Sequence, residues 1–294
     1  MNALKTTSSG TFGSTDAIWN AEKFHRELEA ATGGYAKADP FPHAVFEDML
    51  HADPAIMKAF PDADWPAWTA LGDTYQFHKF SCSDIEAIPE PFAGLIHELS
   101  APTFLRALEQ LTGIKKLIPD PHLKGGGLHL SGPGGVLAPH TDFHLYEPLA
   151  VYRRINVLVY LNEDWEESFG GCLELGPVGS TPKVVVPRWG TVMVFTTDNH
   201  SVHGFPKPIA EGRWRRSIAL YYYTAEETRE FQGDTTTYWR EHGAQSGPVR
   251  KARLGLYRLL NQTSKAISLL AHLVNPNQGM GWWRSRKLRV SKQP

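Results

Sequence analysis

The sequence predicts a mainly β protein with flanking helices, α+β overall. Between about residues 121 and 224, short runs rich in β-branched and aromatic residues alternate with glycine and proline, which is typical of a sandwich or barrel of short strands. On either side of this stretch, apolar residues recur at helical spacing. With 294 residues, the chain is expected to form one large domain with appended segments, or two smaller domains.

Changes in composition and hydrophobic periodicity along the sequence divide the chain into four parts. We expect a disordered leader over residues 1–15, which are polar and rich in glycine and serine, and an α/β support region over 16–120. A β core is expected over 121–230, and a basic helical extension over 231–294.

The expected elements follow from hydrophobic periodicity and from turn residues. In the support region these are a helix over 16–29 with Thr15 or Asp16 as its N-cap, a strand over 41–46, a helix ending near 60–61 and a helical stretch over 91–112. In the β core they are eight strands, over 127–131, 136–142, 153–161, 172–175, 183–186, 191–196, 201–205 and 215–223.

Composition excludes several classes of function. Thirty Lys and Arg balance 31 Asp and Glu, giving a net charge of −1, which argues against a protein dedicated to nucleic acid. Mean hydropathy is −0.33, and neither a signal peptide nor a membrane span is expected. The two cysteines, Cys82 and Cys172, cannot form a disulfide framework, and the simplest compartment is a reducing cytoplasm.

The last fifty residues are basic. No acidic residue follows Glu241, whereas ten Lys and Arg do, and leucines and isoleucine recur at helical spacing from Leu256 to Leu270. We expect an amphipathic helix packed on the β core with a solvated basic face. A membrane-surface or acidic-partner role is the alternative.

The chemistry is expected near Pro139-His140-Thr141-Asp142, at the end of a predicted strand. Side chains at positions i and i+2 of a strand share a face, so His140 and Asp142 can hold one metal ion. A third ligand from a distant strand would complete a 2-His-1-carboxylate set with open positions for substrate, cosubstrate or O₂. The pattern alone is not specific, because His51-Ala52-Asp53 also matches it. That second match opens a predicted helix with Pro54 in its first turn, and we assign it a structural role.

The third ligand is expected in the segment His200-Ser201-Val202-His203-Gly204. We favour His203 over His200, because it lies on a strand-like run and because Gly204 would let the backbone pack closely at the site. His129 is expected to line the barrel or the substrate pocket. His144 is expected past the strand end, as a pocket or surface residue.

The last predicted strand begins with two arginines in a segment otherwise suited to burial. A buried guanidinium needs an anion, and its planar fork suits a carboxylate. Strand parity places Arg215 and Ser217 on one face, where they could bind a dicarboxylate, and Arg216 on the other. Arg216 is the alternative, because an error of one residue in register exchanges the faces.

These motifs together resemble the iron(II)- and 2-oxoglutarate-dependent oxygenases, in the prolyl-4-hydroxylase-like branch. The resemblance covers residues 128–223 and rests on six elements in the family's order. They are His140-Thr141-Asp142, Tyr160-Leu161-Asn162, Gly170-Gly171-Cys172-Leu173, Pro187 with Gly190, His203-Gly204, and Arg215-Arg216-Ser217.

The resemblance implies a double-stranded β-helix (jelly-roll) core. It also implies that Fe(II) is bound by His140, Asp142 and His203, and that Arg215, with Ser217 and Tyr160 beside it, binds 2-oxoglutarate. O₂ would be the second cosubstrate. Family members that transfer halide usually lack the carboxylate ligand, so Asp142 favours hydroxylation of an unactivated C–H bond, with release of succinate and CO₂.

Two other functions are alternatives to an oxygenase. One is a cupin-like isomerase or hydrolase that uses the His/Asp metal site without O₂, although such a protein has no need of Arg215. The other is a non-catalytic binding module that works through its basic extension. The substrate, a small molecule or a peptidyl residue, cannot be chosen, because the expected mouth of the site mixes aromatic and charged groups. These mouth residues are Phe143, His144, Tyr146, Glu147, Tyr152 and Arg153. The oligomeric state is open.

Overall fold

A computed structural model describes residues 18–51, 54–73, 75–226 and 237–239, together with seven residues between 252 and 270. By internal contacts the chain divides into two units, Met1–His242 and Gly243–Pro294. The leader expected over residues 1–15 lies outside the described residues. Within the second unit the seven described residues are helical, in agreement with the expected helix; they are Ala252, Leu256, Leu259, Leu260, Thr263, Ile267 and Leu270.

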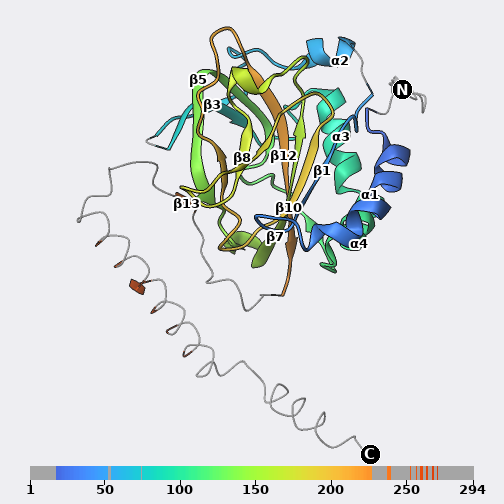
Figure 1. Cartoon of the computed structure of the whole chain (residues 1–294), viewed down its shortest axis with the longest axis vertical. Coiled ribbons are helices and arrows are strands. Elements are labelled where there is room, and N and C mark those ends of the chain that lie inside the picture. Colours follow the sequence, from blue (N-terminus) through green and yellow to red (C-terminus); the bar gives the residue numbers. More distant parts are fainter. Residues whose placement is uncertain are drawn as a thin grey trace, which may run out of the picture. The chain divides into compact units, whose positions relative to one another are not determined.

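The first unit is built on one antiparallel, hydrogen-bonded sheet (Figure 1). Its main path runs in the order β1-β10-β7-β12-β5-β11-β8-β9, with β3 pairing β5 and the short strands attached at the sides. The strands are β1 (His43–Phe46), β2 (Thr69–Leu71), β3 (Gln76–Cys82), β4 (Ile118–Pro119), β5 (Gly127–Thr141), β6 (Leu145–Tyr146), β7 (Val151–Tyr160), β8 (Leu173–Leu175), β9 (Lys183–Val185), β10 (Val192–Thr196), β11 (His203–Phe205), β12 (Arg215–Thr224) and β13 (Tyr238–Trp239).

The neighbours in this sheet are far apart in sequence, as they are in a jelly roll. β7 lies between β10 and β12, and β5 lies between β12 and β11. The sheet curves round an interior cavity that receives side chains from β3, β5, β7, β8, β11 and β12. The fold is therefore the double-stranded β-helix with flanking helices that the sequence predicts.

Helices cover one outer face of the sheet. They are α1 (Ala21–Tyr35), α2 (Pro54–Ala59), α3 (Glu90–Ser100) and α4 (Pro102–Thr112), and α1, α3 and α4 lie together beside β1, β10 and β7 (Figure 1). The alternation of side chains along β7 shows why the helices pack on this face and the cavity lies on the other. Ile155, Val157 and Val159 are fully buried in the core shared with these helices, whereas Asn156 and Leu158 line the cavity on the other side.

Two expectations for the helices are wrong. The first helix begins at Ala21 rather than Asp16, because Asn20 is its N-cap and accepts a hydrogen bond from the Lys23 amide at 3.0 Å. The stretch 91–112 is two helices rather than one. Ala101 between them is extended, with ψ of 153°, because the residue before a proline, here Pro102, disfavours the helical region.

The observed strands agree more closely with those predicted from the sequence. The runs expected over 127–131 and 136–142 form one strand, β5, which ends at Thr141. β3 and its hairpin partner β2 were not expected, although β3 pairs with β5 along much of the cavity wall. In the part of the chain that the structure describes, no helix is long and apolar enough to cross a bilayer.

Candidate metal centre

Two adjacent strands bring the three predicted ligands together. His140 is near the end of β5, Asp142 follows the last residue of that strand, and His203 begins β11. β11 pairs antiparallel with β5 so that His203 lies directly opposite His140. A Cβ atom on Gly204 would lie 2.7 Å from the Leu137 carbonyl oxygen. Glycine is therefore what allows the two strands to approach this closely, as the sequence indicates.

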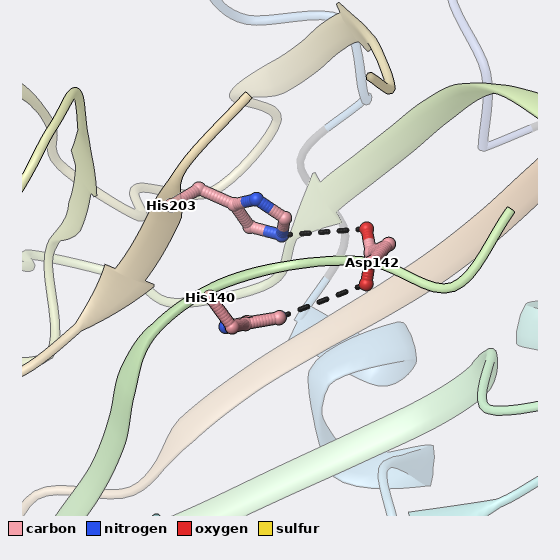
Figure 2. Close-up of side chains that lie close together, drawn as sticks. All are labelled: His140, Asp142 and His203. Atoms are coloured by element: carbon pink, nitrogen blue, oxygen red, sulfur yellow. Dashed lines mark ion pairs between the residues drawn. The ribbon is translucent and has the colours of Figure 1, made fainter. Parts of the chain in front are cut away.

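The donor atoms of the three side chains converge. Nε2 of His140 is 3.6 Å from Asp142 Oδ1, and Nε2 of His203 is 3.6 Å from Asp142 Oδ2 (Figure 2). All the ligand atoms lie within 4.8 Å of one another. These separations are too long for good hydrogen bonds, but they suit three ligands arranged round one ion.

The backbone fixes the tautomer of both histidines. His140 Nδ1 is 2.9 Å from the Ala138 carbonyl oxygen, and His203 Nδ1 is 2.9 Å from the Ser201 carbonyl oxygen. Because a carbonyl oxygen can only accept, both Nδ1 atoms donate and both Nε2 lone pairs face Asp142. This is the arrangement in which proteins usually present histidine to a metal.

Asp142 is held as a carboxylate by Asn156 and Arg153. Its Oδ2 accepts a hydrogen bond from Asn156 Nδ2 at 2.7 Å and pairs with Arg153 Nη2 at 3.0 Å. Arg153 also donates from Nε to Asn156 at 2.8 Å and lies 3.3 Å from the centre of the Tyr221 ring. Burial raises the pKa of Asp142, but Arg153 and then His203 and His140 outweigh this and hold it well below its usual value.

The histidine at the other side of the centre is kept neutral. Burial first, and then the neighbouring His140, lower the pKa of His203 to about 4. Neutral imidazole nitrogen and carboxylate oxygen are donors that bind Fe(II), and a facial set of two histidines and one carboxylate is diagnostic of non-haem iron oxygenases. Among the described residues this is the one group with suitable geometry for a metal ion.

The cavity beside the centre has a volume of about 220 Å³. Arg215 lies in its wall and is 5% exposed. Its Nε donates to the Gly171 carbonyl oxygen at 2.8 Å, and its Nη1 lies 3.4 Å from Ser217 Oγ. No carboxylate among the described residues lies within ion-pair distance of Arg215. Burial lowers the pKa of Arg215. Its guanidinium can therefore gain by pairing with the carboxylate of a ligand.

Tyr160 and His129 border the same position. The Tyr160 ring centre is 5.0 Å from the Arg215 guanidinium, and burial raises the pKa of Tyr160 to about 12. His129 faces Ser217 across the β5–β12 pair. Its Nε2 is buried without a hydrogen-bond partner in the described part of the chain. Among the described residues, the Arg215 guanidinium thus has no carboxylate partner and can pair with an anionic ligand.

Strand parity distinguishes the two arginines. Arg215, Ser217, Ala219 and Tyr221 all line the cavity, whereas Arg216 lies on the opposite face of β12 in a separate hollow with Asp62 and Trp214. The register inferred from the sequence therefore agrees with the structure, and the alternative assignment to Arg216 finds no support in its position.

Other sequence expectations have mixed outcomes. His200 is exposed, and His51 is exposed outside the helix that follows it. His144 is fully buried and does not line the cavity. Of the expected mouth residues, Phe143 and Arg153 line the cavity, and Arg153 is occupied by Asp142.

Lys79, Gln76 and Trp239 also line the cavity, and none of them was expected. The Trp239 ring centre is 4.9 Å from that of His140 and 5.0 Å from that of Tyr75, which is nearly parallel to it. Strand alternation would have placed Gln76 and His78, not Lys79, on one face of β3, and the sequence could not indicate which wall β3 would join.

Comparisons with known proteins identify similar sequences and folds. Residues 126–223 match the family model of the 2OG-Fe(II) oxygenase superfamily. Over 87 residues the chain is 29% identical to prolyl 3-hydroxylase OGFOD1 of Xenopus laevis, a match that covers 28% of this chain. The chain spans only 17% of the length of that curated relative.

The fold is also found in solved structures of low sequence identity. Prolyl 4-hydroxylases from Phytophthora capsici are 18% identical, with a TM-score of 0.50 over 86% of this chain and 79% of theirs. A prolyl hydroxylase from Trichoplax adhaerens, solved with a peptide fragment of hypoxia inducible factor, is 15% identical, with a TM-score of 0.49 over 71% of this chain and 94% of that one. Residues 126–223, a third of the chain, thus match the 2OG-Fe(II) oxygenase family model in sequence and contain the six motifs, and the Phytophthora capsici structures share the fold.

Proposed function

We propose that this protein is an Fe(II)- and 2-oxoglutarate-dependent dioxygenase that hydroxylates an unactivated C–H bond and releases succinate and CO₂. The observation that carries the proposal is the convergence of His140, Asp142 and His203 within 4.8 Å on a cavity that also holds the unpaired guanidinium of Arg215. A metal site without redox chemistry would have no use for that buried cation.

In this proposal the three converging side chains hold Fe(II), which when bound chelates 2-oxoglutarate and activates O₂. Both histidines present Nε2 lone pairs because their Nδ1 atoms donate to backbone carbonyls. Arg153 and Asn156 fix the rotamer of Asp142 and keep it ionised. These hydrogen bonds and the ion pair, which do not involve the metal, determine the orientation of each metal-binding side chain.

Arg215 is assigned to the distal carboxylate of 2-oxoglutarate, with Ser217 and Tyr160 next to it. A guanidinium fork binds a carboxylate through two parallel hydrogen bonds, which fixes the orientation of the cosubstrate as well as its affinity. The apolar side chains of Leu158, Leu173 and Phe205 line the same cavity. They exclude water from the reacting groups.

The substrate is proposed only as a class, either a peptidyl residue or a small molecule. The named relatives are prolyl hydroxylases, which supports a peptidyl or proline-like substrate. A cupin-like isomerase or hydrolase remains the alternative from the sequence, and no observation in the described part of the chain favours it.

The proposal is tested by incubating the purified protein with Fe(II), 2-oxoglutarate and O₂ and measuring succinate, first alone and then with pools of peptides and metabolites. We expect succinate release that requires all three components and that a substrate stimulates. In parallel, calorimetry with Mn(II) in place of iron should show that 2-oxoglutarate binds only after the metal. A protein that binds Mn(II) but no 2-oxoglutarate would contradict the dioxygenase and favour the cupin-like alternative.

A further inference from the structure

We propose that Lys79 forms a second anion-binding position in the cavity, which takes a carboxylate or phosphate group of the primary substrate. The inference rests on the proposed function in one respect, which is that Arg215 is already assigned to 2-oxoglutarate. It names the chemical class of the substrate, which must carry a negative charge at a position away from the C–H bond that reacts.

The position of Lys79 follows from the register of three adjacent strands. Lys79 of β3 lies opposite Ser131 of β5, and Arg215 of β12 lies opposite the same Ser131 from the other side. Residues directly opposite each other in an antiparallel pair point to the same face. Lys79 and Arg215 therefore both point into the cavity, one strand apart, and both line it.

A bulge in the pairing of β3 with β5 directs Lys79 inward. The pairing of β3 with β5 shifts register between Phe77 and Lys79, and His78 between them has a left-handed backbone with φ of 48°. A bulge reverses which side chain faces which side of a sheet and is common next to active sites. A left-handed non-glycine residue costs about 1–3 kcal/mol, so surrounding contacts must hold this conformation in place.

Specific contacts hold the bulge. His78 Nδ1 is 2.8 Å from the Pro133 carbonyl oxygen, and its ring packs edge-on against Trp214 with centres 5.3 Å apart. A Cβ atom on Gly132 would lie 2.4 Å from the His78 ring, so the neighbouring strand has a glycine where the ring needs room. The chain thus maintains a strained residue whose effect is to keep Lys79 on the cavity side.

Among the described residues, Lys79 has no partner of opposite charge. No carboxylate in the described ranges lies within ion-pair distance of its ammonium group. Burial first, and then the nearby Arg215, lower its pKa to about 8, an effect that Asp142 and Asp73 reduce. A desolvated ammonium group beside a second cation is unfavourable unless an anion binds there.

The charges of the cavity indicate an anion beyond the cosubstrate. Among the described residues, three cationic side chains line it, Lys79, Arg153 and Arg215, against the one carboxylate of Asp142. Fe(II) and the 2-oxoglutarate dianion cancel each other in charge, so loading the site leaves this excess unchanged. Arg153 is paired with Asp142, and Arg215 is assigned to the cosubstrate. Lys79 is the cation that remains.

The substrate, rather than 2-oxoglutarate, is the better source of this anion. Both carboxylates of the cosubstrate are already assigned, one to the metal and one to the buried Arg215. Lys79 is half-buried rather than buried, and its neighbours in the same hairpin, Leu71 and Gln76, also line the cavity. The lysine therefore lies on a wall that none of the assigned cosubstrate contacts uses.

The test compares Lys79→Met and Lys79→Arg with the wild-type protein and with Lys183→Met, which removes an exposed lysine of β9. Each is loaded with Mn(II) and 2-oxoglutarate, and calorimetry measures binding of N-acetyl amino acids, dicarboxylates and sugar phosphates. Every anion is paired with its neutral amide or dephosphorylated counterpart. Thermal melting checks that all variants are folded.

We expect at least one anion to bind the wild-type protein and Lys183→Met ten times more tightly than Lys79→Met. Its neutral counterpart should bind all of them alike, and Lys79→Arg should recover most of the affinity. The affinity for 2-oxoglutarate should change less than threefold in Lys79→Met.

Two results would overturn the inference. A tenfold loss of 2-oxoglutarate affinity in Lys79→Met would assign the lysine to the cosubstrate. A panel in which no anion distinguishes the wild-type protein from Lys79→Met would leave no anion position at Lys79. Failure of the proposed function looks different, because the wild-type protein would then bind no 2-oxoglutarate at all.

Discussion

His140 and His203 lie opposite each other on antiparallel strands, with their ring centres 4.4 Å apart. Two imidazoles this close cannot both be protonated without strong repulsion, and both are buried. The carboxylate of Asp142 lies within 3.6 Å of each Nε2 and is itself neutralised by Arg153. Burial and the neighbouring His140 lower the pKa of His203 and hold it neutral, and this has a measurable consequence for stability.

We predict that the metal-free protein loses stability as the pH falls from about 6.5 to about 4. The pKa of His203 is about 4 in the folded protein, below its ordinary value of 6.5. The unfolded chain therefore binds this proton first, and folding becomes less favourable throughout that window. A single group contributes at most about 1.4 kcal/mol per pH unit. Urea unfolding at a series of pH values measures the effect.

The control for this prediction is His203→Gln, which cannot take up the proton and should show a shallower slope. His144, whose pKa burial also lowers to about 4, contributes in the same direction and should keep part of the slope in that variant. Equal slopes in wild type and His203→Gln would show that His203 is not held neutral by the fold.

Removing the carboxylate should abolish metal binding and also weaken the fold. Asp142→Ala leaves Arg153 as a buried cation without its partner, which typically costs about 3–5 kcal/mol. The double variant Asp142→Ala with Arg153→Met removes both charges and should regain much of that stability. Neither should bind Mn(II) or release succinate. Calorimetry and urea unfolding measure the two properties separately, and wild-type metal affinity in Asp142→Ala would refute the ligand assignment.

The two adjacent arginines of β12 should behave differently. Arg215→Ala should raise the concentration of 2-oxoglutarate needed for half-maximal succinate release at least tenfold, because a buried charge-assisted pair is lost. Arg216→Ala, on the opposite face, should change it less than twofold. The reverse outcome would mean that the register of β12 is in error by one residue.

Gly204 should not tolerate a side chain. In Gly204→Ala the new methyl group would lie 2.7 Å from the Leu137 carbonyl oxygen, so β11 must move away from β5. We expect a loss of about 1–3 kcal/mol in stability and weaker Mn(II) binding, since His203 moves with its strand. Gly33→Ala in α1 is the matched control, because its Cβ would meet nothing within 4 Å and helical alanine is favourable. Equal metal affinity in both variants would argue against the role of Gly204.

The sequence predicts that His140, Asp142 and His203 converge because each belongs to a local pattern. His140 and Asp142 share a strand face by parity, and His203 is marked by the glycine that follows it. Arg215 is chosen over Arg216 by the same parity argument. These inferences need only the geometry of a single strand. The pairing of β5 with β11 then brings His203 opposite His140.

Features that depend on tertiary pairing could not be predicted in the same way. Nothing in the local sequence places Lys79 in the cavity, because its position depends on the pairing of β3 with β5. The helix boundary at Asn20 depends on the contact of Trp19 with Leu50, which no local pattern reveals. The break at Ala101 could have been predicted, because Pro102 follows it and disfavours helix at that residue.

Tyr75 and Trp239 are stacked with their ring centres 5.0 Å apart, although 164 positions separate them and both lie outside residues 126–223. Trp239 is at the same time the aromatic neighbour of His140. The aromatic wall beside His140 is therefore encoded outside the stretch that carries the three converging side chains. Substitutions in this pair would reshape the cavity, which Trp239 lines, without altering His140, Asp142 or His203.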